Sequence, residues 1–541
     1  MGKRLKGWGY PLWIGLVCGF AVLHAIHLGA DFPNHSPWSF DFAKYTDEGW
    51  WGNAAIRAHL FGNWYMPGDF NPAAATPVWP FLEWILFFFT GVSAEAARGL
   101  AVTVFFVNLV LSYLLLRARG PRWVGLLAVT LLVTSPFLYS FSRLAILEPL
   151  LMALTLGALN LAVRLPSLRR KGSVSIAIGL LFTLMLLTKT TAVFLLPALA
   201  WAMVAPLWRK RRLAAKCVLA AGAAAAASFG VWMALIARFD LLADYRYLFF
   251  VNKYQKPDEF YWPLISFWWT IRGLLWADRI LIPLAALVLI AGALAWPSEW
   301  SRKLRRNVVF CSSVLAVAGY ILFMTYQNHP QPRYYTVIAF FAMFMVVLGI
   351  EALVGAAGNG AEAPEFAARD GWNRFGGAAL GYGFVVAAVL GAGVNAEWTL
   401  DYALHPEYTL VPAVEKLTRF VDQHPNGKRL LLSTSSDEIT MISHLPTICD
   451  DFGTQDLESK LKEYQPGWFA TWNYVDPGTL EDLHNRYSLE QVASFHALDD
   501  PDRDVLVLFK LHPLANGRVR ELPVAALQQA LPGDRIKIPI E

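Results

Sequence analysis

Charged residues are scarce in this sequence. Asp, Glu, Lys and Arg make up 16% of the 541 residues, whereas hydrophobic residues make up 56% and the mean hydropathy is +0.40. Soluble domains usually contain roughly 25% charged residues. The composition therefore excludes a disordered chain, a fibrous protein and an ordinary cytosolic enzyme, and it indicates a membrane protein.

Cysteine is also scarce. Of the 4 cysteines, Cys18, Cys217 and Cys311 fall in apolar stretches, whereas Cys449 stands alone in a polar region. So few cysteines in a chain of this length exclude a disulfide framework, and their spacing indicates neither a zinc site nor a redox pair.

Acidic residues are few in the first three quarters of the chain, where basic residues outnumber them. Residues 1–395 contain 33 Lys and Arg but 18 Asp and Glu, a charge of +15. Residues 396–541 contain 13 basic and 23 acidic residues, a charge of −10. We therefore predict two domains, a basic transmembrane domain over 1–395 and a small acidic soluble domain over 396–541.

Long apolar runs are abundant in the first domain. A helix that crosses a bilayer needs about 20 mostly apolar residues. The sequence predicts an all-α polytopic domain with about eleven such helices, near residues 10–29, 96–116, 122–139, 144–163, 173–188, 190–207, 214–237, 278–296, 307–325, 334–353 and 376–395.

Basic residues predict the orientation of these helices. Lys3, Arg4 and Lys6 precede the first helix, and basic clusters recur in every second connection, as expected for cytoplasmic loops. The N-terminus is therefore predicted inside, and the second domain outside the membrane after eleven crossings. We expect a multi-pass protein of a bacterial inner membrane. The later clusters lie at 117–122, 164–171, 209–212, 302–306 and 369–374.

Two long outer loops follow from this topology, at 30–95 and 238–277. The first contains an apolar segment, 77–90, that is short for a span and includes Pro77 and Pro80. We therefore predict a re-entrant or interfacial helix there. The second loop is rich in aromatic and charged residues.

The second domain alternates runs typical of helices and strands. VPAVEKLTRFVDQH has apolar residues at helical spacing. RLLLST, WFATWNY and VLVLFKL are typical of short strands. The sequence predicts a small extracytoplasmic α/β domain.

Several ionisable residues lie at the predicted outer ends of the helices, where charge is costly without a partner or a function. Arg and Lys hold phosphate groups, and a carboxylate accepts the proton of a hydroxyl group. This face therefore suits a phosphorylated substrate together with a reacting hydroxyl. The residues are Asp47, Glu48, Arg143, Glu148, Lys189, Lys253, Lys256 and Arg333, and Glu83 lies in the apolar segment of the first loop.

The same segments resemble a known family. YTDEGWWGNAAIRAHLFGNW, followed by NPAAATPVWPFLEWILFFFTG, is similar to the first outer loop of the GT-C glycosyltransferases that use polyprenyl-phosphate sugars. These include protein O-mannosyltransferases and lipid A aminoarabinose transferases. SRLAILEPLL resembles the family's fourth helix, LLTKTTA its Thr-Lys segment and HPQPRYYTV its Pro-Arg-Tyr entry to a late helix. The resemblance covers residues 10–350.

The resemblance implies an enzyme that moves a sugar from a polyprenyl-phosphate donor to a hydroxyl on a lipid, glycan or protein acceptor at the outer face, with inversion. Nucleic acid is not an expected partner. The resemblance implies no required cofactor, and it leaves open whether a divalent metal ion binds at Asp47 and Glu48. The implied roles are Asp47 as base, Glu48 as second acid, Lys189, Arg333, Lys253 and Lys256 as donor-phosphate contacts, and Glu148, Arg143, Tyr334 and Glu83 as cavity residues.

The chain departs from the family pattern at three positions. Glu148 stands where the family commonly has Asp, Thr190 follows the Thr-Lys pair in place of Gly, and Lys253 replaces a loop His. These departures leave the sugar and the acceptor unidentified.

Spacing alone leaves structural alternatives open for these residues. Asp47 or Thr46 suits a helix cap, and Arg57 suits a structural role. Glu148 suits an ion pair with Arg143. Lys189 suits an extended side chain that reaches the lipid headgroups, and Arg333 suits an anchor at the membrane interface. The alternative functions are a lipid or sugar transporter or flippase with a charged outer cavity, and a membrane scaffold.

Overall fold

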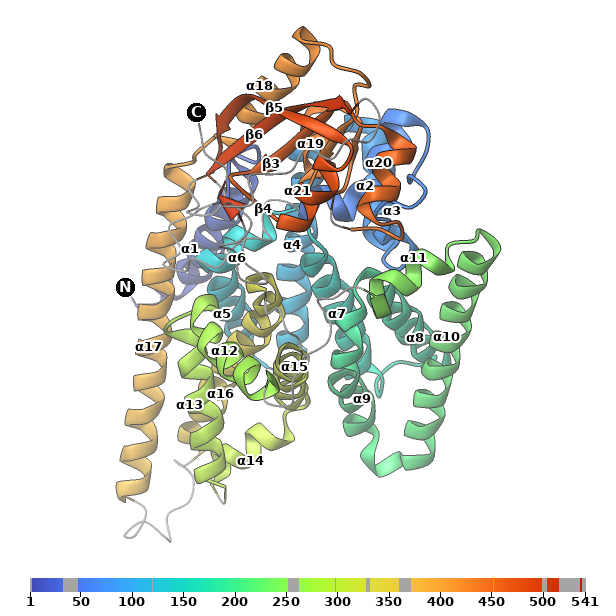
Figure 1. Ribbon diagram of the computed structural model, residues 1–541. Helices are drawn as coiled ribbons and strands as arrows, with labels where there is room; N and C mark the ends of the chain where they lie inside the picture. The colour runs from blue at the N-terminus through green and yellow to red at the C-terminus, as the bar shows by residue number, and fades with distance from the viewer. Residues whose placement is uncertain are drawn as a thin grey trace.

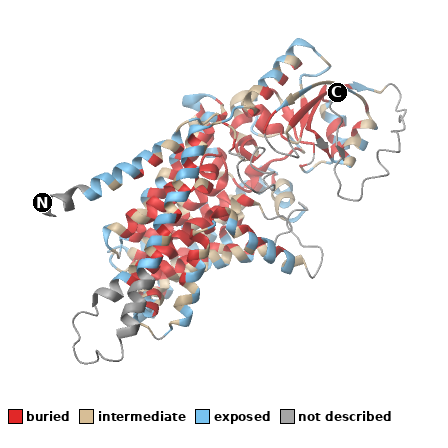
Figure 2. Cartoon of the chain, turned by 90° about the vertical axis from the view of Figure 1, so that its left-hand side faces the viewer, coloured by how far each residue is buried: buried red, intermediate tan, exposed pale blue. Residues whose placement is uncertain are grey.

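The computed structural model describes residues 2–32, 47–118, 120–251, 262–296, 298–326, 331–359, 371–450, 452–498, 504–514 and 536–537. A bundle of long helices fills most of the molecule, and a small sheet covered by short helices lies at one end of it (Figure 1). Buried residues concentrate in the centre of the bundle and in the sheet, whereas the first half of α1 (Gly2–Ala25) extends away from the bundle (Figure 2).

The bundle consists mainly of α-helices, with short 3-10 or π segments where they change direction. The helices of the bundle after α1 are α4 (Ala94–Arg117), α5 (Arg122–Val133), α6 (Pro136–Ser142), α7 (Leu147–Arg164), α8 (Lys171–Thr188), α9 (Leu196–Val204), α10 (Arg211–Arg238), α12 (Trp262–Ala277), α13 (Leu281–Leu294), α14 (Glu299–Arg306), α15 (Val308–Thr325), α16 (Tyr335–Asn359) and α17 (Gly371–Leu404). The connecting elements between them are α2 (Asp47–Phe61), η1 (Pro72–Ala74), α3 (Val78–Thr90), η2 (Thr190–Leu195), η3 (Ala205–Lys210), α11 (Leu242–Arg246), η4 (Tyr247–Val251) and η6 (Pro332–Tyr334).

The predicted polytopic all-α domain is confirmed. Among the described residues, 7 helical stretches are long and apolar enough to cross a membrane, or up to 9 if two bent pairs each count as one span. One stretch, Thr190–Arg238, holds both α9 and α10, which run in opposite directions in Figure 1. The count of eleven spans stays a prediction.

Two predicted segments, a helix and an outer loop, contain or adjoin a sharp bend in the structure. The run 122–139 is broken into α5 and α6, which meet at 72°. The break has a local cause. The side chain of Ser135 caps α6 by accepting a hydrogen bond from the N–H of Leu138, and Pro136 occupies the first position of that helix. The described residues of the predicted second outer loop, 238–251 and 262–277, are largely helical, and the last helix of the loop, α12, meets α13 at 117°.

The pattern of burial identifies α16 as the central helix of the bundle. In α16, Val337 through Leu348 are buried in an unbroken run, as expected for a central helix that is surrounded on all sides. The end of the bundle marked by α14 lies far from the sheet (Figure 1). Because α14 carries Lys303, Arg305 and Arg306, a basic cluster and the acidic domain lie at opposite ends, as the predicted topology requires. The orientation itself stays a prediction.

The first outer loop contains the helix expected for its apolar segment. This helix, α3, spans Val78–Thr90 and is shorter than a membrane span. Phe88 and Phe89 are exposed on it, whereas Trp79 and Glu83 are completely buried. The position of α3 in the membrane interface stays a prediction.

The C-terminal part is a mixed α/β domain, as predicted. Its five-stranded sheet has the order β2-β1-β3-β6-β5, with β1 parallel to β2 and β3, and β6 antiparallel to β3 and β5. The predicted helix and three predicted strands are present. The elements are α18 (Leu410–Gln423), β1 (Leu431–Ser433), α19 (Ser436–Ser443), β2 (Thr447–Ile448), α20 (Leu457–Tyr464), β3 (Trp468–Trp472), β4 (Tyr474–Val475), α21 (Pro477–His484), β5 (Tyr487–His496), β6 (Val505–Pro513) and β7 (Ile536–Lys537).

The two parts are joined by more than the chain. The last bundle helix, α17, continues past the predicted boundary at 395 and ends at Leu404. Asp31, after α1, accepts hydrogen bonds from the backbone N–H of Thr409 (2.7 Å) and of Leu410 (3.1 Å), so it caps the first helix of the α/β domain. On the other side, α2 packs against α19.

Candidate functional site

Four charged residues from distant segments meet between the bundle and the α/β domain. Asp47 begins α2, Glu148 lies in the first turn of α7, Lys189 joins α8 to η2, and Arg333 lies in η6 before α16. The two carboxylates and Lys189 are buried, and the Arg333 side chain is 11% exposed. We call these four residues the site cluster.

The site cluster is held together by ion pairs. Arg333 pairs with Asp47, and its Nε lies 3.6 Å from Oε1 of Glu148. Lys189 donates a hydrogen bond to the same Oε1. The ring of Tyr334 lies beneath both cations, 4.6 Å from Nζ of Lys189 and 5.2 Å from Cζ of Arg333. Two acids and two bases therefore balance each other beside an electron-rich ring face.

One carboxylate oxygen of the site cluster is unsatisfied. Oε2 of Glu148 is buried and has no hydrogen-bond partner in the part of the chain that the structure describes. Leaving a buried acceptor without a donor is costly, and such atoms in native proteins mark functional positions or places for water and ligand groups. The site cluster therefore has capacity for a polar ligand group.

The second acid of the predicted pair has different partners. Glu48 accepts hydrogen bonds from Nε (2.8 Å) and Nη2 (2.6 Å) of Arg98, and from the N–H of Ala145 (2.9 Å). Successive residues of a helix point about 100° apart, so Asp47 and Glu48 face different neighbours. Nη1 of Arg98 donates to the carbonyls of Leu28 and Ala30. Glu48 thus ties α2 to α4 and to the start of α7.

The remaining predicted site residues take other positions. Arg143 donates hydrogen bonds to the hydroxyl of Tyr139 and to the carbonyl of His27, and no ion pair with Glu148 occurs among the described residues. Glu83 of α3 is fully buried against α2, where a Cβ at Gly52 would lie 2.3 Å from its Oε2. Lys253 and Lys256 lie outside the described residues.

Comparisons with known proteins agree with this architecture. Residues 74–234 match a family model described as dolichyl-phosphate-mannose-protein mannosyltransferase. ArnT from Cupriavidus metallidurans, bound to undecaprenyl phosphate, is 13% identical and has a TM-score of 0.59, with 93% of this chain and 98% of that chain covered. No curated protein matches the sequence.

A second solved structure is the archaeal oligosaccharyltransferase AglB from Archaeoglobus fulgidus, in complex with an inhibitory peptide and a dolichol-phosphate. It is 11% identical and has a TM-score of 0.51, with 92% of this chain and 74% of that chain covered. The chain has the GT-C fold. The matches also support the predicted enzyme class, a membrane glycosyltransferase.

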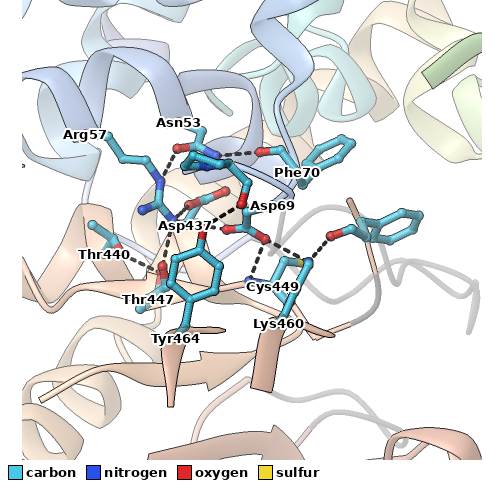
Figure 3. A network of polar contacts seen from close by, with 12 residues as sticks. Asn53, Arg57, Asp69, Phe70, Asp437, Thr440, Thr447, Cys449, Lys460 and Tyr464 are labelled. Atoms are coloured by element: carbon cyan, nitrogen blue, oxygen red, sulfur yellow. Dashed lines mark hydrogen bonds and ion pairs between the residues drawn. The ribbon is translucent and has the colours of Figure 1, made fainter. Parts of the chain in front are cut away.

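Within this GT-C fold, a second buried group of charges joins α2 to the α/β domain (Figure 3). Nη2 of Arg57 donates to the carbonyl of Thr447 (2.6 Å) and to carboxylate oxygens of Asp437 (3.3 Å) and Asp69 (3.5 Å). Nζ of Lys460 donates to Asp69 (2.9 Å) and to the carbonyl of Cys449 (2.9 Å). We call Arg57, Asp69, Asp437 and Lys460 the interdomain network.

Burial sets the ionisation of this region. It raises the pKa of Asp437 to about 7, and Arg57 offsets part of that shift. The guanidinium of Arg57 connects α2 with α19 and β2, which agrees with the structural role that the sequence suggested for this residue.

Sequence reasoning missed two charged residues beside the site. Arg98, the partner of Glu48, lies in α4, and a lone Arg inside an apolar run was a usable signal. Glu438 lies in α19, where its Oε2 accepts a hydrogen bond from the N–H of Gly49 (3.0 Å). An acidic residue in a soluble domain has many possible roles, so its sequence context offered no signal.

No cluster of His, Cys, Asp or Glu that could hold a metal ion occurs among the described residues. The acidic pair that the sequence offered for a metal is divided between Arg333 and Arg98. The requirement for a metal stays a prediction to be tested.

Proposed function

We propose that the protein transfers a sugar from a polyprenyl-phosphate carrier to an acceptor hydroxyl at the outer face of the membrane. The observation that carries the proposal is the site cluster, in which an acid that begins a helix meets two cations. The bound undecaprenyl phosphate of ArnT and the dolichol-phosphate of AglB support a polyprenyl-phosphate group as part of the donor.

In the proposed reaction, Asp47 is the general base. Its carboxylate accepts the proton of the acceptor hydroxyl, and the oxygen attacks the anomeric carbon of the donor sugar. The bond between that carbon and the phosphate oxygen breaks, and the electron pair leaves with the polyprenyl phosphate. A single displacement of this kind inverts the anomeric carbon.

Arg333 and Lys189 stabilise the leaving phosphate. Charge-assisted hydrogen bonds from guanidinium and ammonium groups are stronger than neutral ones, and they gain further strength where water is excluded. Lys253 and Lys256 remain candidates for the same role.

Donor binding and base activation are coupled in this arrangement. Arg333 pairs with Asp47 in the structure, and a donor phosphate competes for the same guanidinium. Once Arg333 turns to the phosphate, Asp47 loses its ion pair with Arg333 and becomes a stronger base. Glu148, which also lies near Lys189 and Arg333, keeps both cations in place.

We propose that no metal ion is required, because two cations already face the site. The test is the transfer rate of purified protein after removal of divalent ions with a chelator. An unchanged rate supports the proposal, and a loss that magnesium or manganese restores contradicts it.

The main test begins with a strain that lacks the gene. Mass spectrometry of its lipids and glycans, compared with the parent strain, identifies the product as a missing sugar mass. The strain is then complemented with wild type, Asp47→Asn or the control Asp401→Asn, since Asp401 is exposed on α17. We expect Asp47→Asn to lower product formation by about 10²- to 10⁴-fold, the usual contribution of a general base.

Two outcomes contradict the proposal. Folded Asp47→Asn protein that restores the product at the wild-type rate excludes Asp47 as the base. A strain without any missing sugar, but with reduced movement of a lipid across the membrane, favours the transporter.

A further inference from the structure

The α/β domain touches the first turn of the helix that carries Asp47. At this contact α2 and α19 approach so closely that a Cβ at Gly49 would lie 2.2 Å from the carbonyl carbon of Asp437 and from the nitrogen of Glu438. Real Cβ atoms do not tolerate such distances in a packed interior, so the position requires glycine. Figure 1 shows α19 above α2 at the junction of the two parts.

Glu438 provides the polar contact at this point. Its side chain is 1% exposed, and its Oε2 accepts a hydrogen bond from the N–H of Gly49 at 3.0 Å. The first four N–H groups of an α-helix have no partner within the helix, and Gly49 is the third residue of α2. Glu438 therefore caps α2, a role that a residue just before the helix usually has.

We propose that Glu438 is a positioning residue for Asp47, so that the α/β domain holds the catalytic helix in place for sugar transfer. The inference rests on the proposed function, because it assigns a partner to the proposed base. It gives the α/β domain a defined part in the reaction.

Burial and the charges around Glu438 influence whether its carboxyl group is neutral or ionised. Glu48 and Asp47 of α2 and Arg98 of α4 influence it, and burial together with Glu48 raises the pKa of its carboxyl group well above the ordinary value. A neutral carboxyl group still accepts the hydrogen bond of Gly49 through its carbonyl oxygen. Ionised Glu438 adds a negative charge beside two acids, which weakens the contact between α19 and α2.

A glutamine at position 438 separates this role from simple packing. Glu438→Gln keeps the size and the accepting oxygen but never ionises. For wild type we expect a loss of activity as the pH rises and Glu438 ionises. We expect Glu438→Gln to retain the transfer rate at neutral pH and to lack this alkaline loss. Glu438→Ala removes the cap, and we expect its rate to fall about fivefold to tenfold.

The assay uses membrane vesicles from the gene-deleted strain as the source of native donor and acceptor. Purified protein is reconstituted into them, and the initial rate of the mass-shifted product is followed from neutral to alkaline pH. Glu415→Ala, an exposed acid of α18, is the control and is expected to match wild type.

A second variant tests the contact without altering an acid. Gly49→Ala forces α2 and α19 apart, and we expect it to lower the rate, whereas Gly222→Ala in α10 has open space around its Cβ and is expected to leave the rate unchanged. If Glu438→Ala fails to fold, the pH profile of the transfer rate of Glu438→Gln tests the inference instead. A loss of rate at alkaline pH equal to that of wild type overturns the inference.

The outcomes for the two proposals are distinguishable. Wild-type rates for both Glu438→Ala and Gly49→Ala, with Asp47→Asn inactive, overturn the positioning role and leave the proposed function intact. An active Asp47→Asn overturns the proposed function itself.

Discussion

The site cluster and the interdomain network each contain two acids and two bases, and both are largely buried, but they differ in how well their polar atoms are satisfied. In the interdomain network, Lys460 donates to Asp69 and to the carbonyls of Cys449 and Phe452, which uses all three of its N–H groups. In the site cluster, Lys189 and Arg333 lie at the same oxygen of Glu148, and the other oxygen has no hydrogen-bond partner among the described residues.

This difference separates a structural contact from a reactive one. A saturated network of buried charges resists any change, because each group that loses its partner stays buried and uncompensated. A cluster with an unsatisfied oxygen and shared cations can exchange partners when a ligand enters. We therefore expect substitutions in the site cluster to act on transfer, and substitutions in the interdomain network to act on stability.

The largest effect on transfer outside Asp47 is expected for Arg333→Ala. It removes the guanidinium that stabilises the leaving phosphate, and we expect product formation to fall by about 10²- to 10³-fold. The product is measured by mass spectrometry in the complemented strain. Arg302→Ala is the control, since Arg302 forms an exposed pair with Glu299 in α14. A similar loss in both variants would show that the effect is not specific to the site cluster.

The largest effect on stability is expected for Lys460→Met. Asp69 loses its ammonium partner while buried, and breaking a buried pair in this way costs about 3–5 kcal/mol of unfolding free energy. Thermal unfolding in detergent measures the loss. Lys462→Met is the matched control, because Lys462 is exposed on the same helix, α20. Equal unfolding temperatures for the two variants contradict a structural role for the network.

A smaller effect is expected for Lys189→Gln. The glutamine still donates hydrogen bonds but lacks the positive charge, so we expect product formation to fall about tenfold, close to the lower limit of about 1.5 kcal/mol for hydrogen bonds to charged groups. Lys171→Gln, at the other end of α8, serves as the control. A wild-type rate for Lys189→Gln excludes it from phosphate binding, while Arg333 remains a candidate.

The last prediction concerns the pH dependence of stability. Because burial raises the pKa of Asp437 to about 7 from an ordinary 3.8, the unfolded chain releases this proton at lower pH than the folded chain does. The contribution of Asp437 to stability is therefore fully present below about pH 4 and is lost as the pH rises through about 7. Asp437→Asn keeps an acceptor for Arg57 and is expected to flatten this part of the profile. Unfolding temperatures between pH 5 and pH 8 measure it, and an unchanged slope contradicts the assignment.

The helices and several strands were predictable because burial imposes a pattern on the sequence. Apolar runs of sufficient length located α4, α7, α8, α15 and α16, and short runs rich in aliphatic or aromatic residues located β1, β3 and β6. The bend between α5 and α6 was not predictable from hydropathy, because the apolar run continues across it. A serine cap and the permissive first-turn position of Pro136 make the break possible, and packing determines its angle.

The site was predictable in part, for a related reason. Ionisable residues at membrane depth are rare unless they have a partner or a function, so Asp47, Glu148, Lys189 and Arg333 could be selected one by one. The pairing of these charges could not be predicted from the sequence, because it depends on which helices become neighbours. Asp47 and Glu48 adjoin in the sequence but face Arg333 and Arg98, which are 235 residues apart in the chain.

By itself, the sequence determined that this protein is a polytopic helical membrane protein with a separate acidic α/β domain, since hydropathy and charge depend on residue type alone. Only the tertiary structure decided that Glu438 of that domain caps the helix of Asp47 and that Arg333 is the partner of Asp47. Such contacts join segments hundreds of residues apart, and no local pattern in the chain encodes them.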